Sequence, residues 1–127
     1  LLFQITDDIL DACGDELPVW SGNDDLTVPL LSLGAKGVIS VLSNVRPKRT
    51  LQMVRACQAG DYAAAGRMQV ALTPLIDALF SEINPIPVKQ ALSLMGIPAG
   101  LPRLPLTPLS ATHLPALEQA LSAAPEP

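Results

Sequence analysis

The most informative pattern in the chain is a short apolar run at residues 38–42, with Gly37 before it and Ser43 and Asn44 after it. An apolar run of this length, rich in β-branched residues and closed by turn formers, favours a strand buried on both faces over a helix. Strands of that kind belong to parallel sheets whose two faces are covered by helices. The pattern therefore predicts an α/β layer organised around residues 38–42.

The segments before and after this run predict its neighbours. Residues 17–21 predict a short first strand, and residues 25–33 predict an apolar helix that ends at Gly34. A strand, a covering helix and a second strand at this spacing form a right-handed βαβ unit. Amphipathic helices are also predicted at residues 3–13 and 47–59.

No strand pattern remains after Gly60. Three helices are predicted in the rest of the chain, at residues 61–81, at residues 88–96 and from Ser110 or Thr112 onward. The proline-rich segment 98–108 predicts an extended connection whose neighbouring leucines pack, at Leu101, Leu104, Leu106 and Leu109. We therefore divide the chain near Gly60 into a βα portion, residues 1–60, and a helical appendage, residues 61–127.

Composition narrows the possible classes of function. The 127 residues are 49% apolar and only 16% charged, with a net charge of −4 and a mean hydropathy of +0.36. Globular domains carry about 25% charged residues, so we expect apolar faces that a partner or further parts of the same chain would cover. The acidic balance argues against a nucleic-acid binder, which needs a basic field. No apolar run approaches the roughly 18 residues that a membrane span requires.

The start of the chain and its cysteines indicate a cytoplasmic origin. Leu1 is not a methionine and no basic leader follows it, so we expect the chain to begin within a longer sequence. Cys13 and Cys57 form no CxxC motif, and both fall on predicted helices. We predict reduced, buried thiols rather than a disulfide or a metal site.

Small polar residues follow both predicted strands. Ser21, Gly22 and Asn23 come after the first strand, and Ser43 and Asn44 come after the second. Because adjacent parallel strands end at the same edge of a sheet, these groups could together orient a carboxylate or a carbonyl. Ordinary turn and capping chemistry is the commoner use of such residues.

The charged residues do not predict a further catalytic or metal-binding site. Asn23 or Asp24 is predicted to cap the helix at residues 25–33. A solvated helix face is the interpretation we favour for the basic cluster of Arg46, Lys48, Arg49 and Arg55. His113 has no cysteine or acidic partner at ligand spacing, so a surface position at a helix start is expected. We expect neither a metal nor any other cofactor.

None of the three lysines predicts a reactive amine. Lys36 precedes the second strand at its amino end, while Lys48 and Lys89 lie on polar helix faces. A Schiff-base lysine needs an environment that keeps the amine uncharged, such as an apolar pocket. The sequence also contains no Cys/His, Ser/His/Asp or glycine-rich phosphate motif.

Four motifs in order carry a family resemblance. They are PVWSGND at residues 18–24, GVISVLSNV at 37–45, NPIPVK at 84–89 and RLPLTP at 103–108. Their order and spacing resemble the carboxyl-terminal half of the dihydrodipicolinate synthase (4-hydroxy-tetrahydrodipicolinate synthase) family, across essentially all 127 residues. The last two motifs favour this family over relatives that resemble sialic-acid lyase.

The resemblance implies an α/β fold, the carboxyl-terminal part of a (β/α)8 TIM barrel followed by a three-helix appendage. Two parallel strands with covering helices in residues 1–60 would be the end of the barrel, from its sixth helix to its eighth. Residues 61–127 would be the appendage. The family usually assembles as a homo-oligomer, so a tetramer or a dimer is expected.

The resemblance also implies a class I aldolase-type lyase of lysine biosynthesis, which condenses pyruvate, held as a Schiff base, with aspartate semialdehyde. Three substrate-binding positions are implied here: the backbone carbonyl of Ile39, Gly22 near the bound substrate, and Asn84 near the second substrate. The family's Schiff-base lysine and proton-relay tyrosine would precede Leu1. We therefore expect no catalytic residue in this chain, and no activity from it alone.

Two alternatives remain open on the residues. One is a related pyruvate-dependent aldolase that acts on a sugar acid. The other is a non-catalytic module that binds or oligomerises through exposed aliphatic faces.

Overall fold

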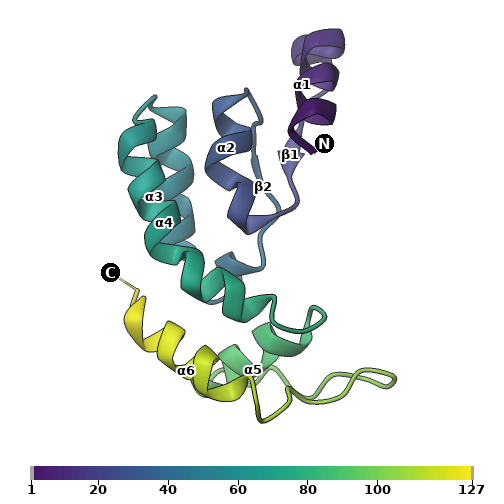
Figure 1. Ribbon diagram of the computed structural model, residues 1–127, viewed down its shortest axis with the longest axis vertical. Helices are drawn as coiled ribbons and strands as arrows, with labels where there is room; N and C mark the ends of the chain where they lie inside the picture. The colour runs from purple at the N-terminus through teal and green to yellow at the C-terminus, as the bar shows by residue number, and fades with distance from the viewer. Residues whose placement is uncertain (1, 127) are drawn as a thin grey trace.

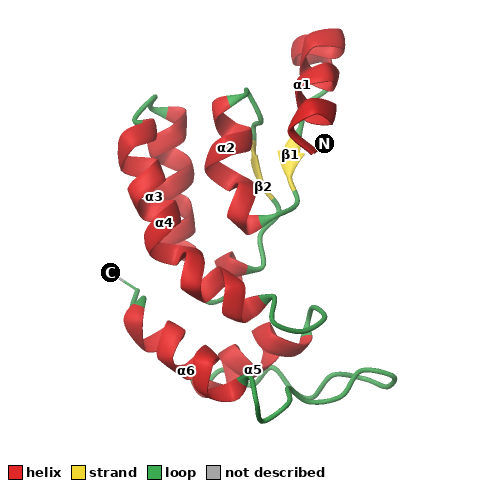
Figure 2. Cartoon of the chain, viewed as in Figure 1, coloured by secondary structure: helices red, strands yellow, loops and turns green. Residues whose placement is uncertain are grey.

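The computed structural model describes residues 2–126, with the side chains of all of these except residues 2, 3 and 15. Helices dominate the chain, and the two strands are short (Figure 2). The elements in order are α1 (Leu2–Cys13), η1 (Gly14–Glu16), β1 (Trp20–Ser21), η2 (Asp24–Leu26), α2 (Thr27–Ser32), β2 (Gly37–Val38), η3 (Leu42–Asn44), α3 (Pro47–Gln58), α4 (Tyr62–Leu79), α5 (Ile86–Leu94) and α6 (Leu114–Ala123), where η denotes a 3-10 helix.

The two strands form the predicted βαβ unit. β1 and β2 pair in parallel, with Trp20 opposite Gly37 and Ser21 opposite Val38, and the connection between them runs through η2 and α2. A Cβ at position 37 would lie 2.5 Å from the ring of Trp20, so glycine leaves room for the indole in its present position. The indole therefore rests directly on the backbone of the neighbouring strand.

Both strands are shorter than the apolar pattern predicts. The strand expected at residues 38–42 ends at Val38, Ile39 is 74% exposed, and Leu42 begins a 3-10 helix. The prediction of burial on both faces is therefore wrong. In the described part of the chain β2 has one neighbouring strand, β1, whereas such burial needs strands and helices on all sides. The first strand likewise spans two residues instead of 17–21.

Helices α2, α3 and α4 pack against one another, and α2 lies beside β2 (Figure 1). α3 begins at Pro47 and buries Thr50, Met53 and Cys57, as its 3.6-residue period predicts. A chain reversal at Gly60, with φ of +79°, separates α3 from α4.

The helix predicted at residues 61–81 is α4, which contains Pro74. Asp61 caps it as expected, because its Oδ1 accepts the N–H of Ala64 at 2.9 Å. Its buried face packs on α2 and α3, and its far end reaches α5 and α6 (Figure 1).

The core crosses the predicted boundary at Gly60. One cluster joins Leu30 and Leu31 of α2 and Cys57 of α3 to Ala65 of α4. A larger cluster runs from η3 through α3 and α4 to α5 and α6, and it includes Leu42, Met53, Leu72, Leu79 and Leu117. Both portions thus contribute to the same clusters. The division into residues 1–60 and 61–127 stays a prediction.

The proline-rich segment between α5 and α6 extends away from the helices (Figure 1). Leu101 is 77% exposed and Leu104 is 88% exposed, so the prediction that these leucines pack is wrong. Leu106 and Leu109 are half-buried. The outer leucines lie where the described chain offers no surface to cover them.

The last helix begins later than predicted, at Leu114. Ser110 and Thr112 do not cap it; the N–H of Ser110 instead donates to Oε1 of Glu82 at 3.0 Å. This bond ties the end of the extended segment to the loop after α4.

Both cysteines are free, and the predicted burial is confirmed for Cys57 but is wrong for Cys13. Cys57 is buried, and this burial raises the pKa of its thiol, whereas Cys13 is only half-buried. None of the described helices combines the length and the apolar character that crossing a membrane would demand.

Candidate functional site

The candidate site lies at the carboxyl ends of the two strands, and we call residues 21–25 and 39–44 the rim. The parallel ladder brings the two parts together. The N–H of Lys36 donates to the carbonyl of Val19, and the N–H of Ile39 donates to the carbonyl of Ser21, each at 2.8 Å. Gly22 therefore follows directly on a residue that is hydrogen-bonded to Ile39.

Ser21 serves its own turn. Its Oγ donates to the carbonyl of Asn23 at 2.8 Å and accepts the N–H of Asn23 at 3.2 Å, and the residue is fully buried. The hydroxyl is thus used within the rim and is shielded from a ligand. For Ser21, the sequence leaves open a contact with a ligand or an ordinary turn, and the structure shows the turn.

Asp24 does not cap the helix that follows it. Neither it nor Asn23 makes a side-chain cap at the start of η2 or α2. Instead Oδ2 of Asp24 accepts the N–H groups of Val41 and Leu42, both at 2.9 Å. Asp24, a predicted helix cap, thus bridges the two turns of the rim. The sequence pattern does not reveal this bridge, because its two ends lie 17 and 18 residues apart.

The second turn closes on itself in the same way. Oγ of Ser40 accepts the N–H of Ser43 at 2.8 Å, and Oγ of Ser43 donates to the carbonyl of Ser40 at 3.0 Å. Nδ2 of Asn44 donates to the carbonyl of Val41 at 3.0 Å. Ser43 and Asn44 thus shape the turn through these bonds, although Asn44 is exposed.

The three predicted substrate-binding residues lie on two different parts of the fold. Gly22 and Ile39 adjoin each other on the rim, and both are exposed. No atom lies within 4 Å of a Cβ built on Gly22, so the space beside its backbone is open. Asn84 is exposed in the loop between α4 and α5. A role in substrate binding stays a prediction for all three.

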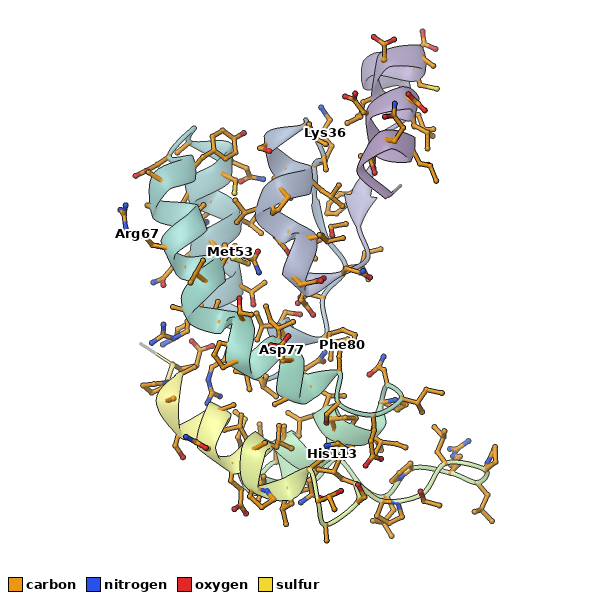
Figure 3. The ribbon with its side chains drawn as sticks, viewed as in Figure 1. Lys36, Met53, Arg67, Asp77, Phe80 and His113 are labelled. Carbon is orange, nitrogen blue, oxygen red and sulfur yellow. The ribbon has the colours of Figure 1, made fainter. Side chains whose placement is uncertain are left out.

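A cavity of about 220 Å³ adjoins the rim on the side of α4. Its lining comes from the first turn and from the end of α4, at Asn23, Asp25, Ile76, Asp77 and Phe80. Figure 3 labels Asp77 and Phe80 at the end of α4. The two carboxylates make the cavity unsuited to a carboxylate ligand, because like charges repel at close range. The cavity therefore favours a neutral or cationic group over a carboxylate.

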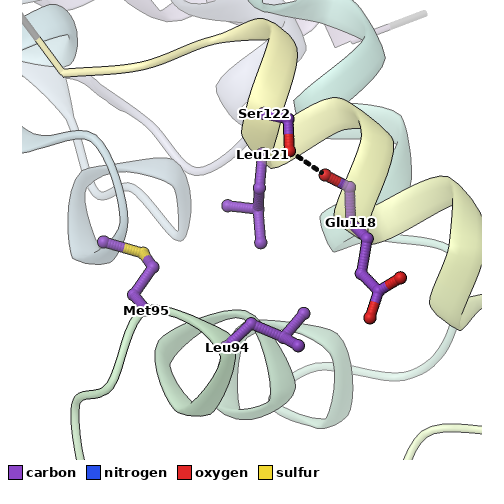
Figure 4. Close-up of a pocket in the computed structure, with 5 residues that line it drawn as sticks. All are labelled: Leu94, Met95, Glu118, Leu121 and Ser122. Carbon is purple, nitrogen blue, oxygen red and sulfur yellow. Dashed lines mark hydrogen bonds between the residues drawn. The ribbon is translucent and has the colours of Figure 1, made fainter.

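A larger cavity, about 440 Å³, lies between α5 and α6 (Figure 4). Leu94, Met95, Glu118, Leu121 and Ser122 line it. The hydroxyl of Ser122 donates to the carbonyl of Glu118 at 2.9 Å, which is a bond within the helix. The lining thus offers one carboxylate and no activated nucleophile.

The basic cluster does not form the solvated face that we predicted. Lys48 and Arg55 are exposed, but Arg46 is only 6% exposed. Its Nη1 donates to the carbonyl of Val45 and its Nη2 to that of Leu121, both at 2.7 Å, and its Nε donates to that of Ala124. Burial lowers the pKa of Arg46, the nearby Glu126 opposes this shift, and Arg49 adds to it.

The remaining titratable residues lie away from the rim. Lys36 is at the amino end of β2, Lys48 is on α3, and Lys89 is on α5, where it donates to the carbonyl of Ala99. His113 precedes α6, with Nε2 3.9 Å from Oε1 of Glu82. Across the described residues, no cluster of three or more histidine, cysteine or acidic side chains could hold a metal.

Comparison with known proteins places the chain among synthases. The sequence model of the dihydrodipicolinate synthetase family matches residues 3–124. The 4-hydroxy-tetrahydrodipicolinate synthase of Methanocaldococcus jannaschii is 48% identical over 120 residues, which are 94% of this chain and 40% of that protein.

Solved structures agree in fold. The dihydrodipicolinate synthase of Cyanidioschyzon merolae with lysine bound matches at a TM-score of 0.91 and 38% identity, over 95% of this chain and 41% of that one. The chloride-inhibited dihydrodipicolinate synthase of Acinetobacter baumannii complexed with pyruvate matches at a TM-score of 0.88 and 39% identity. The match covers 93% of this chain and 40% of that one. These neighbours are TIM-barrel enzymes, so the predicted fold class, part of a (β/α)8 barrel, is confirmed. The chain spans about two fifths of the length of these relatives.

Proposed function

Because the chain belongs to the dihydrodipicolinate synthetase family, we propose that it forms the carboxyl-terminal part of a class I aldolase-type lyase. The complete enzyme condenses pyruvate, held as a Schiff base on a lysine, with aspartate semialdehyde in lysine biosynthesis. The match over residues 3–124 is the observation that carries this proposal. The two adjoining parallel strands support it, since barrel enzymes place their chemistry at the carboxyl ends of such strands.

In this proposal the chain contributes backbone groups to one side of the active site. The carbonyl of Ile39 accepts a hydrogen bond near the Schiff base, and Gly22 admits substrate close to the main chain because no side chain intervenes. Asn84 contacts the second substrate. Fixed backbone dipoles of this kind stabilise charge without having to reorganise during the reaction.

The covalent step is supplied by another part of the enzyme. An imine forms when an uncharged amine attacks the keto carbon of pyruvate and water leaves. Lys36, Lys48 and Lys89 lie away from the rim, so the 127-residue chain alone forms no pyruvate adduct. The complete enzyme is a homo-oligomer, a dimer or a tetramer.

A chimera tests the proposal. In it, this chain replaces the matching carboxyl-terminal segment of the M. jannaschii synthase, which is 48% identical to it. We expect the chimera to form condensation product from pyruvate and aspartate semialdehyde, and borohydride to trap pyruvate on it. Mass spectrometry measures both the product and the adduct. The 127-residue chain alone serves as the matched control, and it should yield neither.

The alternatives predict different results. Trapping of pyruvate with turnover of a sugar-acid aldehyde, but not of aspartate semialdehyde, would identify a related aldolase. A folded chimera that traps no pyruvate would contradict the synthase proposal. Such a result would favour an interaction module, for which the exposed Trp20 on β1 and the exposed Ile39, directly after β2, provide apolar surface.

A further inference from the structure

A single carboxylate joins the two turns of the rim. Asp24 is 1% exposed, and its Oδ2 accepts two N–H groups from residues 17 and 18 positions further along the chain. Hydrogen bonds to a carboxylate are about twice as strong as those between neutral groups. The turn that follows β1 is therefore fixed to the turn that follows β2 by one side chain.

Helix α4 holds the same turn from the other side. Nε2 of Gln69 donates to the carbonyl of Asp24 at 3.0 Å, and its Oε1 accepts the N–H of Val28 at 3.3 Å. Gln69 is 8% exposed. One amide thus satisfies two backbone groups that flank the start of α2, and it connects them to a helix 45 residues away in sequence.

We infer that Asp24 and Gln69 are positioning residues, which hold the two turns of the rim in the register that substrate contacts by Gly22 and Ile39 require. The inference rests on the proposed function. Gly22 lies two residues before Asp24, and Ile39 lies two residues before Val41, so a slip of either turn moves a proposed contact. A displacement of about 1 Å at an active site can lower the rate on the order of 100-fold.

Asp24 permits a matched pair of substitutions. Within the part of the chain that the structure describes, no donor reaches its Oδ1. An asparagine at position 24 can therefore keep its amide oxygen in the place of Oδ2, where it accepts the N–H groups of Val41 and Leu42. Its NH2 group then takes the place of Oδ1, where it meets no other donor. Alanine removes the acceptor entirely. Asp24→Asn should thus rescue what Asp24→Ala loses.

The test uses the chimera with Asp24→Ala, Asp24→Asn or Gln69→Met, the last of which keeps the length of the side chain but removes both hydrogen bonds. We expect Asp24→Ala to lower kcat/KM for pyruvate by about 10- to 100-fold and Gln69→Met to lower it less. Asp24→Asn should stay within about threefold of the parent chimera, since its hydrogen bonds survive. Hydrogen exchange at the amides of Val41 and Leu42 should quicken at least tenfold in Asp24→Ala only.

A stability control separates positioning from folding. Leu117→Ala empties part of the core in α6, away from the rim, where the side chain is fully buried. It should lower Tm while leaving kcat/KM for pyruvate unchanged. Equal kcat/KM in Asp24→Ala and Leu117→Ala, or unchanged exchange at Val41 and Leu42, would overturn the inference. An inactive parent chimera would contradict the proposed function instead, and the exchange measurement would still decide the role of Asp24.

Discussion

Among the described residues, Sδ of Met95 lies 3.5 Å from Nη1 of Arg46, but the guanidinium is held mainly by three backbone carbonyl oxygens. Two of them, those of Leu121 and Ala124, belong to the carboxyl-terminal end of α6 and to the residue after it. The last carbonyls of a helix lack partners within the helix and carry partial negative charge. The guanidinium therefore satisfies these groups and fastens α6 to the residue that precedes α3.

We predict that Arg46→Met destabilises the chimera by about 1–3 kcal/mol, because it leaves buried carbonyl oxygens without donors. Arg46→Lys should not restore the loss, since one ammonium cannot reproduce the planar fork of a guanidinium. Urea unfolding measures both effects. Arg55→Met, an exposed change on α3, should stay within about 0.5 kcal/mol of the parent. Full recovery in Arg46→Lys would contradict the proposed role.

At this scale the sequence predicts little of what the charged residues do. Arg46 looks like one member of a basic surface cluster, and Asp24 looks like a helix cap. Their partners lie 75 and 78 residues away for Arg46, and 17 and 18 for Asp24. Local pattern predicts a cap or a solvated face because it records only near neighbours. The hydroxyl of Ser21 bonds two residues away, so turn chemistry could anticipate it.

The elements are predicted more successfully, and helices better than strands. The periodicity of residues 47–59 and 61–81 arises within each helix, so the sequence alone indicates which stripe is buried. A strand depends on its neighbours, and in the described part of the chain β2 has one neighbouring strand, β1. The same reason accounts for Leu101 and Leu104, which are apolar and yet exposed.

A contact between two elements carries a pH dependence. Oε1 of Glu82, after α4, accepts hydrogen bonds from the hydroxyl and the N–H of Ser110, before α6. These two bonds lower the pKa of Glu82 below its ordinary value of 4.5, and His113 adds to the effect. The folded state thus favours the charged carboxylate. The stabilisation is present above pH 4.5 and is lost as the pH falls through the lowered pKa.

We therefore predict that Glu82→Gln flattens the dependence of Tm on pH in the acid range. Thermal unfolding of the chimera between pH 7 and pH 3 measures the profile. Glu118→Gln removes an exposed carboxylate from α6 and should leave the profile unchanged. If Glu82→Gln kept the parent's acid dependence, the contact with Ser110 would not be its cause.

For the molecule as a whole, one region of exposed apolar surface lies between β2 and α3. A cavity of about 300 Å³ lies between β2 and α3, and Trp20, Val38, Leu51 and Val54 are among the residues that line it. Trp20 is 53% exposed and Leu51 is 48% exposed. Exposed apolar surface beside an unpaired strand edge invites pairing with another chain.

We predict that the 127-residue chain alone self-associates. Light scattering after size-exclusion chromatography should give a mass above that of one chain, 13.3 kDa. Ile39→Lys should reduce the association, because a charge directly after β2 opposes pairing along the edge of that strand. Val70→Lys places the same charge at a site 72% exposed on α4 and should not. A monodisperse monomer that unfolds cooperatively would contradict the prediction.

Because α2, α3 and α4 share one apolar cluster, the cluster determines where the polypeptide can be split into two pieces. A break at the Gly60 reversal looks convenient, because the turn is exposed and both helices are complete on either side of it. It would nevertheless leave Leu30 and Leu31 on one piece and Ala65 on the other, and would take Gln69 away from the turn that it braces. Two polypeptides divided there should recover the fold only when they are mixed, with the α3–α4 contact as the surface that recombines.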